Sequence, residues 1–399
     1  MEIRKLRPEE NVHRILMSSI CFGDAPPEDR YSFLEEPEKH TSGYEHSWGV
    51  FDDEGRLLSC LQVIPARMQI NGHPVKFGLV CGVTTLPEVR NSRCVRKMYE
   101  SIMPHMKDEG MVFSFLYPFS FPFYRKFGYE HAWIKYRASV PISELAKYPY
   151  PDGIKIHDKG GPWVDFAKVY ETFIQGKNLA MVRGKEEWEN LLRRDPYKNR
   201  EFTYIHYNSA NEPDAYILYN REKKDKESTF HLKIVELAWA DKIGLHSILG
   251  FIYGMRSEYE DFSWMLPNDA DIYTLVENPC NVSLSIETIG MNRVLDVPAA
   301  LRLIVPPPEA GNAVIGITDA FLCYNTGVYC IAWEDGRISI KNTGRSPDME
   351  INIETLAQLI TGYQTPAQAQ HCQNVVIHSK MEELMALFPL KNLYLMERF

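Results

Sequence analysis

The sequence has 399 residues, of which 45% are hydrophobic and 24% charged, and its formal net charge is −9. This length predicts two or three domains, and the composition is typical of a soluble globular protein. The negative charge argues against nucleic acid as a partner, and no segment has the roughly 18 apolar residues that a membrane span needs. The eight cysteines include no C-x-x-C pair, so we expect neither a metal site nor a disulfide framework, which fits a cytoplasmic protein.

The first segment, residues 1–150, is predicted to form a mixed sheet flanked by helices. Strand patterns lie at 44–51, 57–68, 75–86 and 111–117. Apolar residues at helical spacing predict a helix over 94–109, and Gly110 ends it. The resulting β-β-β-α-β order is typical of an α/β layered domain.

The second segment, residues 151–290, follows a proline-rich break at Tyr148-Pro149-Tyr150-Pro151. Helices are expected at 164–174, 185–193 and 243–256, and strands at 203–206, 215–220, 229–238 and 262–266. This order loosely repeats the first segment, but Asp241 precedes the last helix where a basic turn would be needed. Because an acidic N-cap repels phosphate, we interpret this segment as a structural copy without a cofactor site.

The third segment, residues 291–399, combines three strands with three helices. The strands are predicted at 313–319, 327–333 and 337–341, and the helices at 353–361, 365–375 and 379–387. The chain ends in the apolar, aromatic stretch Tyr394-Leu395-Met396-Glu397-Arg398-Phe399. Since a frayed terminus is usually polar, we expect this tail to be tucked into the body of the protein and its α-carboxylate to be a buried or half-buried anion.

Three arginines occupy the turn between the strand at 75–86 and the helix at 94–109. Arg90, Arg93 and Arg96 are spaced at i, i+3 and i+6. Cations at a helix N-terminus are unfavourable unless a ligand supplies negative charge, and the backbone N–H groups there bind phosphate well. The pattern indicates a site for a phosphate-bearing ligand such as coenzyme A. The alternative is a solvated helix start whose arginines point to water.

Tyr124 lies about thirty residues after this turn and could act as a proton donor. A tyrosine hydroxyl has a pKa near 10 and can protonate a leaving thiolate, and nearby cations would lower that pKa. The alternative is that Tyr124 only packs at an aromatic strand end. Asp24, in a turn beside an apolar stretch, could pair with a cationic amine, although turn aspartates often have only a structural role.

Together these motifs resemble the Eis-like (enhanced intracellular survival) group of GNAT N-acetyltransferases. The residues that carry the resemblance are Val83-Thr84-Thr85-Leu86-Pro87-Glu88-Val89-Arg90, Phe123-Tyr124-Arg125-Lys126-Phe127-Gly128-Tyr129 and the aromatic carboxyl terminus. The resemblance covers the whole chain. It implies an α/β fold with an active GNAT domain, a degenerate GNAT domain and a domain similar to sterol carrier protein, within the three segments above.

The resemblance also implies roles for individual residues. The backbone of Val83, Thr84 and Thr85 would pair with the pantetheine arm of acetyl-CoA. The pyrophosphate would be held by Arg90, Asn91, Ser92, Arg93, Cys94, Val95 and Arg96, and the thiol end would be lined by Phe119 and Ser120. Tyr124 would be the general acid, the α-carboxylate of Phe399 the general base, and Asp24 part of an acidic acceptor pocket. A homohexamer is a further family expectation.

Two positions depart from the family pattern. GNAT phosphate turns usually read Arg/Gln-x-x-Gly-x-Gly/Ala, whereas this chain has Arg93 and Val95 at the two small positions. Our hypothesis is an acetyl-CoA-dependent N-acetyltransferase that acts on a primary amine, either an aminoglycoside-like polyamine or a lysine side chain. The alternatives are a non-catalytic protein that has lost tight coenzyme A binding and, less favoured, a lipid carrier.

Overall fold

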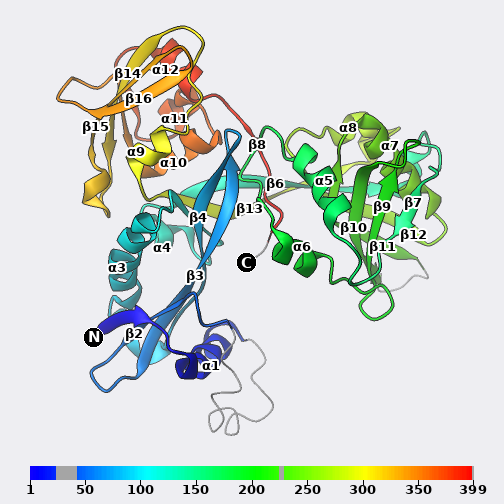
Figure 1. Ribbon diagram of the computed structural model, residues 1–399, viewed down its shortest axis with the longest axis horizontal. Helices are drawn as coiled ribbons and strands as arrows, with labels where there is room; N and C mark the ends of the chain where they lie inside the picture. Colours follow the sequence, from blue (N-terminus) through cyan, green and yellow to red (C-terminus); the bar gives the residue numbers. More distant parts are fainter. Residues whose placement is uncertain (24–42, 224–228, 398–399) are drawn as a thin grey trace.

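A computed structural model describes residues 1–23, 43–223 and 229–397. Three bodies of mixed helix and strand are visible, with the long β3–β4 hairpin at their centre (Figure 1). In the described part of the chain, no helix is both long and apolar enough to cross a membrane.

The first body holds a twisted sheet with α3 packed against it. Its elements are β1 (Glu2–Lys5), α1 (Asn11–Phe22), β2 (Ser47–Phe51), β3 (Leu57–Ile70), β4 (His73–Thr85), α3 (Cys94–Asp108), β5 (Phe113–Leu116), α4 (Phe121–Arg125) and β6 (Glu130–Pro141). The apolar spacing that predicted the helix at 94–109 places Met98, Ile102 and Met106 in the core. That helix and the four strands are confirmed, whereas α1 and β6 were not predicted.

The second body repeats the arrangement. It contains β7 (Ile154–Ile156), α5 (Val164–Phe173), β8 (Lys177–Asn178), α6 (Lys185–Leu191), β9 (Glu201–Tyr207), β10 (Pro213–Lys223), β11 (Phe230–Trp239), α7 (Lys242–Gly254), β12 (Tyr259–Leu266) and α8 (Ile272–Leu275). All predicted elements of this segment are present. Asp241 caps α7 as expected, because its carboxylate accepts a hydrogen bond from the Gly244 N–H at 2.9 Å.

The third body is a five-stranded sheet covered by helices. Its elements are α9 (Val297–Leu301), β14 (Gly311–Thr318), β15 (Gly327–Glu334), β16 (Arg337–Asn342), β17 (Met349–Asn352), α10 (Ile353–Thr361), α11 (Pro366–Cys372), β18 (Val376–Ile377) and α12 (Met381–Leu387). The three helices and three strands predicted here are confirmed. Leu356 and Ile360 of α10 share one hydrophobic cluster with Phe77 and Phe113 of the first body, so the third body packs directly on the first.

The first two bodies share a single sheet, in which β6 of the first body pairs antiparallel with β12 of the second. β13 (Ser283–Val294) lies between β5 and β6 and pairs antiparallel with both. The resulting twelve-stranded sheet has the order β1-β2-β3-β4-β5-β13-β6-β12-β11-β10-β9-β7. Residues 179–182 also run along β3, where the Ala180 carbonyl accepts a hydrogen bond from the Gln69 N–H at 2.8 Å. The first two bodies are therefore held together by backbone hydrogen bonds.

Candidate functional site

A cleft opens where two parallel strands of the first body diverge. β4 pairs with β5 from Phe77–Phe113 to Val80–Leu116, while β4 itself continues to Thr85. Its register against β3 shifts next to Gly82, whose φ is +59°. Such a bulge bends a strand, so the last residues of β4 turn away from β5 and leave room for a ligand between them.

The cleft has a volume of about 690 Å³ and lies beside the first turn of α3. Ten of the predicted cofactor residues line it: Val83, Thr84, Thr85, Arg90, Asn91, Arg93, Cys94, Val95, Arg96 and Phe119. Ser92 and Ser120 do not contribute to its wall. The structure therefore brings together the end of β4, the basic turn and the loop after β5.

Arg93 keeps the backbone shape of the glycine that the family pattern has at its position. Its φ is +63° and its ψ is +21°, and Asn91 two residues earlier has a φ of +72°. Only glycine adopts this left-handed conformation without steric cost. The turn thus retains a sharp bend into α3, and the side chains of Arg90 and Arg93 are exposed at the cleft.

Tyr124 lies behind the cleft in α4, with 2% of its surface exposed. Its ring packs against Phe119, Phe123 and Tyr129, at centroid distances of 5.5, 5.1 and 6.1 Å. Burial raises the pKa of Tyr124, and the neighbouring Tyr129 adds to the increase. The expectation that cations lower this pKa is wrong, because burial raises it, and the adjacent Arg125 pairs with Glu130 at 2.8 Å. The phenol stays protonated over a wide pH range and can donate a proton, although as a weaker acid than a solvated tyrosine.

The carboxyl-terminal segment is tucked into the body, as the sequence predicted. It runs from the third body down to the second (Figure 1), where β19 (Asn392–Leu393) pairs parallel with β8. Tyr394 and Leu395 are buried. The Tyr117 hydroxyl, just after β5, donates to the Glu397 carbonyl at 2.5 Å. Asp24 and Phe399, predicted to act on the acceptor amine, lie outside the described residues.

Sequence reasoning assigned no role to several residues of the cleft wall: Cys21, Phe22, Val89, Phe123, Lys126 and Phe127. Cys21 and Phe22 lie at the end of α1. The apolar residues at helical spacing in α1 were the sequence signal that could have predicted this helix. Lys126 adds a fourth cation to the three arginines of the turn. Phe22 and Phe119 are exposed at the cleft and present apolar surface there.

The second body has a cleft at the corresponding place but with different charges. β11 and β12 are also parallel, and a space of about 1020 Å³ opens beside the start of α7. Its wall includes Asp241, Asp269 and Asp271 together with Lys147 and Lys242, and Asp241 caps α7. Although this cleft is larger, its acidic cap repels phosphate, so we base the site on the first body.

Three family models match consecutive parts of the chain. An acetyltransferase (GNAT) domain matches residues 2–132, a second acetyltransferase (GNAT) domain matches 179–302, and a sterol carrier protein domain matches 297–396. No curated protein matches the chain significantly in sequence.

Solved structures share the whole fold. A GCN5-related N-acetyltransferase from Anabaena variabilis has a TM-score of 0.86 at 18% identity, with both chains covered completely. Eis1 from Mycobacterium abscessus has a TM-score of 0.82 at 17% identity, again over all of both chains. A GCN5-related N-acetyltransferase from Kribbella flavida has a TM-score of 0.80 at 18% identity and covers 100% of this chain and 98% of its own. At these identities the likeness shows a common fold.

Proposed function

We propose that this chain, whose parts match two acetyltransferase (GNAT) domains and a sterol carrier protein domain and whose fold is that of Eis1, transfers the acetyl group of acetyl-CoA to a primary amine. The observation that carries this proposal is the cleft between β4 and β5, with four cations along its wall: Arg90, Arg93, Arg96 and Lys126. A pyrophosphate adds negative charge at the start of α3 and beside these cations, of which Arg96 already pairs with Glu100 at 3.6 Å.

Each part of acetyl-CoA has a binding place along the cleft. The pyrophosphate sits on the turn, where the bend at Arg93 turns the first N–H groups of α3 toward it. The backbone of Val83, Thr84 and Thr85 pairs with the pantetheine arm in the gap that β5 leaves. The thiol end reaches Phe119 and Ser120. The Arg93 side chain is exposed and lines the cleft.

Transfer proceeds by direct attack in a ternary complex. The neutral amine nitrogen forms a bond to the carbonyl carbon, the carbon–sulfur bond breaks, and the sulfur leaves with its electron pair. The Tyr124 hydroxyl gives its proton to that sulfur, and the α-carboxylate of Phe399 takes the proton that the amine loses. A backbone N–H near Val83 polarises the carbonyl oxygen.

The acceptor is an aminoglycoside-like polyamine or a peptide lysine, which Asp24 helps to bind. The net charge of −9 favours such cationic acceptors. We also propose a cytoplasmic homohexamer, which light scattering would test against the chain mass of 46.2 kDa.

Isothermal titration with acetyl-CoA, followed by detection of free coenzyme A thiol in a screen of amines, tests the proposal. We expect saturable binding that Arg90→Ala weakens, and thiol release that depends on an added primary amine. No heat and no thermal shift at millimolar acetyl-CoA would reject it in favour of a non-catalytic binding protein.

A further inference from the structure

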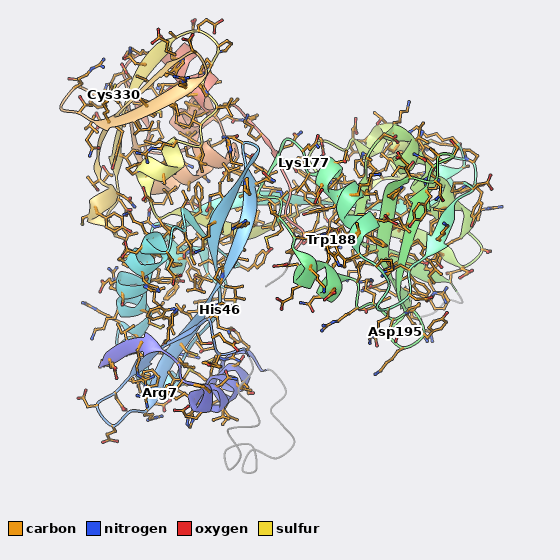
Figure 2. All side chains as sticks on the ribbon, in the orientation of Figure 1. Arg7, His46, Lys177, Trp188, Asp195 and Cys330 are labelled. Carbon is orange, nitrogen blue, oxygen red and sulfur yellow. The ribbon has the colours of Figure 1, made fainter. Side chains whose placement is uncertain are left out.

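A loop of the sterol carrier protein domain, residues 319–326, reaches the wall of the cleft between β4 and β5. It joins β14 to β15 and contacts α3 near both ends of that helix. The Phe321 ring centroid lies 5.3 Å from Arg96 Cζ, and the Tyr324 ring centroid lies 5.4 Å from Lys107 Nζ. Figure 2, in which Cys330 marks β15, shows the lower end of this domain beside the side chains of α3. Arg96 lines the cleft, whereas Lys107 belongs to the last turn of α3.

The backbone of Phe321 is held in place by Asp319. Asp319 Oδ1 accepts hydrogen bonds from the N–H groups of Phe321 at 3.1 Å and Leu322 at 2.9 Å. Its Oδ2 pairs with Arg293 Nη2 at 2.6 Å, and both of these side chains are fully shielded from solvent. Leu322 is buried in one hydrophobic cluster with Met98 of α3. Because charge-assisted hydrogen bonds and burial both hold the loop, the Phe321 ring projects from a rigid support.

The Arg96 guanidinium lies within cation–π range of two rings from different domains. Phe127, in the first acetyltransferase domain, lines the cleft and has its ring centroid 5.8 Å from Arg96 Cζ. Phe321 is nearer, at 5.3 Å, and the two rings meet edge to face at an interplanar angle of 79°. A ring attracts a guanidinium within about 6 Å of its centroid. The sterol carrier protein domain therefore supplies half of the aromatic surroundings of a cleft cation.

Arg96 has one further partner, Glu100, which lies one turn later in α3. The two side chains are 43% and 52% exposed, and 3.6 Å separates Nη1 from Oε1. An exposed helical pair with its cation N-terminal to its carboxylate is weak, and it contributes less than a cation–π contact. Glu100 also lies on the side of Arg96 that is further from the basic turn. The rings are therefore the stronger restraint on the Arg96 side chain.

We propose that Phe321 is a positioning residue for coenzyme A binding, which together with Phe127 holds the Arg96 guanidinium at the cleft before the ligand arrives. The inference rests on the proposed function, in which Arg96 helps to hold the pyrophosphate. An arginine that is already restrained loses less side-chain entropy when it binds a phosphate. The sterol carrier protein domain thus contributes to the acetyl-CoA site through Arg96.

Phe321→Leu tests the inference, because it removes the ring and keeps an apolar side chain. We expect isothermal titration to show acetyl-CoA binding weakened about two- to fivefold, the effect of one exposed cation–π contact. The KM for acetyl-CoA should rise while kcat stays the same, since the contact acts on binding and not on the chemical step. Phe321→Tyr keeps the ring at this half-buried position, and it should bind acetyl-CoA as tightly as the natural chain.

Tyr324→Leu is the matched control. It removes a ring that lies on the same loop, against the same helix and beside a cation, but that cation is Lys107 in the last turn of α3. This variant also loses the hydrogen bond from the Tyr324 hydroxyl to the Leu295 carbonyl at 3.2 Å. Its melting temperature should therefore fall at least as much as that of Phe321→Leu, whereas its affinity for acetyl-CoA should stay unchanged.

A double variant shows whether Phe321 acts through Arg96. In the background of Arg96→Ala, Phe321→Leu should cause no further loss of acetyl-CoA affinity, because the effects of two residues in one interaction are not additive. A full additional loss in this background would overturn the inference.

Two other results would also overturn it. Natural affinity in Phe321→Leu would show that the ring is not needed. An equal loss of affinity in Phe321→Leu and Tyr324→Leu would show that only the docking of the loop matters.

The natural chain and Arg96→Ala separate this inference from the proposed function. No binding of acetyl-CoA by the natural chain rejects both. Binding that Arg96→Ala weakens and Phe321→Leu leaves unchanged rejects only the positioning role.

Discussion

Arg293 and Asp319 form an ion pair in which both side chains are fully shielded from solvent, with 2.6 Å between Nη2 and Oδ2. Arg293 belongs to β13, and Asp319 follows β14 in the sterol carrier protein domain. The same loop carries Phe321, whose ring lies 5.3 Å from that of Phe127 and 5.3 Å from the Arg96 guanidinium. The pair therefore fixes the C-terminal domain against the cleft between β4 and β5, the proposed coenzyme A site.

Asp319→Asn should lower the free energy of unfolding by about 3–5 kcal/mol, because it leaves the Arg293 cation buried without its carboxylate. Urea unfolding measures the loss. Glu222→Gln, which breaks the exposed pair with Lys233, should cost less than about 1 kcal/mol. Equal losses in the two variants would contradict the role given to the buried pair.

Gly128→Ala should destabilise the protein more than Gly160→Ala. Both glycines have a left-handed φ, of +79° and +86°, so each alanine costs roughly 1–2 kcal/mol in backbone strain. Only at Gly128 would the new Cβ meet a buried group, at 2.7 Å from Arg293 Cζ. The difference in melting temperature between the two variants reports this contact, and no difference would mean that the Arg293 side chain moves freely.

Arg93→Gly should bind acetyl-CoA within about threefold of the natural chain and should melt at a higher temperature. Glycine removes the cost of the +63° φ, about 1 kcal/mol, and leaves the backbone N–H groups in place. Asn91→Gly, at a φ of +72°, is the matched control for the backbone effect alone. Loss of binding only in Arg93→Gly would show that the guanidinium itself holds the phosphate.

Tyr124→Phe should reduce kcat by about 10²–10⁴-fold and leave the KM for acetyl-CoA unchanged, because only the proton donor is removed. Because the pKa of Tyr124 is raised, its hydroxyl stays protonated at every pH below that raised pKa. The kcat of the natural chain should therefore show no decline from Tyr124 ionisation up to about pH 10. A pH profile of kcat checks this, and a basic limb near pH 8 that disappears in Tyr124→Phe would contradict it.

The sequence predicted the basic turn, the helix after it and the longer helices and strands of the second and third segments, because each has a local pattern. It did not predict the short elements β7, β8, α8, β17 and β18. It also did not predict the left-handed backbone conformation of Arg93. Glycine is the residue that favours this conformation, and here the surrounding fold imposes it on an arginine. The pKa shift of Tyr124 was predicted with the wrong sign. Adjacent cations are visible in a sequence, whereas the pairing of Arg125 with Glu130 and the aromatic rings around the phenol depend on folding. The place of β13 between β5 and β6 depends on pairing between distant segments. A strand pattern in the sequence does not show which other strands it pairs with.

The insertion of β13 has a consequence for how the chain can be divided. A fragment that stops before Ser283 keeps all of β5 and β6 but loses the strand that hydrogen-bonds to both. Two facing edges would then be left open, and open edges pair with other molecules and aggregate. The first acetyltransferase domain is therefore contiguous in space but not in sequence. An expression fragment of it must include residues 283–294, either joined by circular permutation or supplied as a separate peptide.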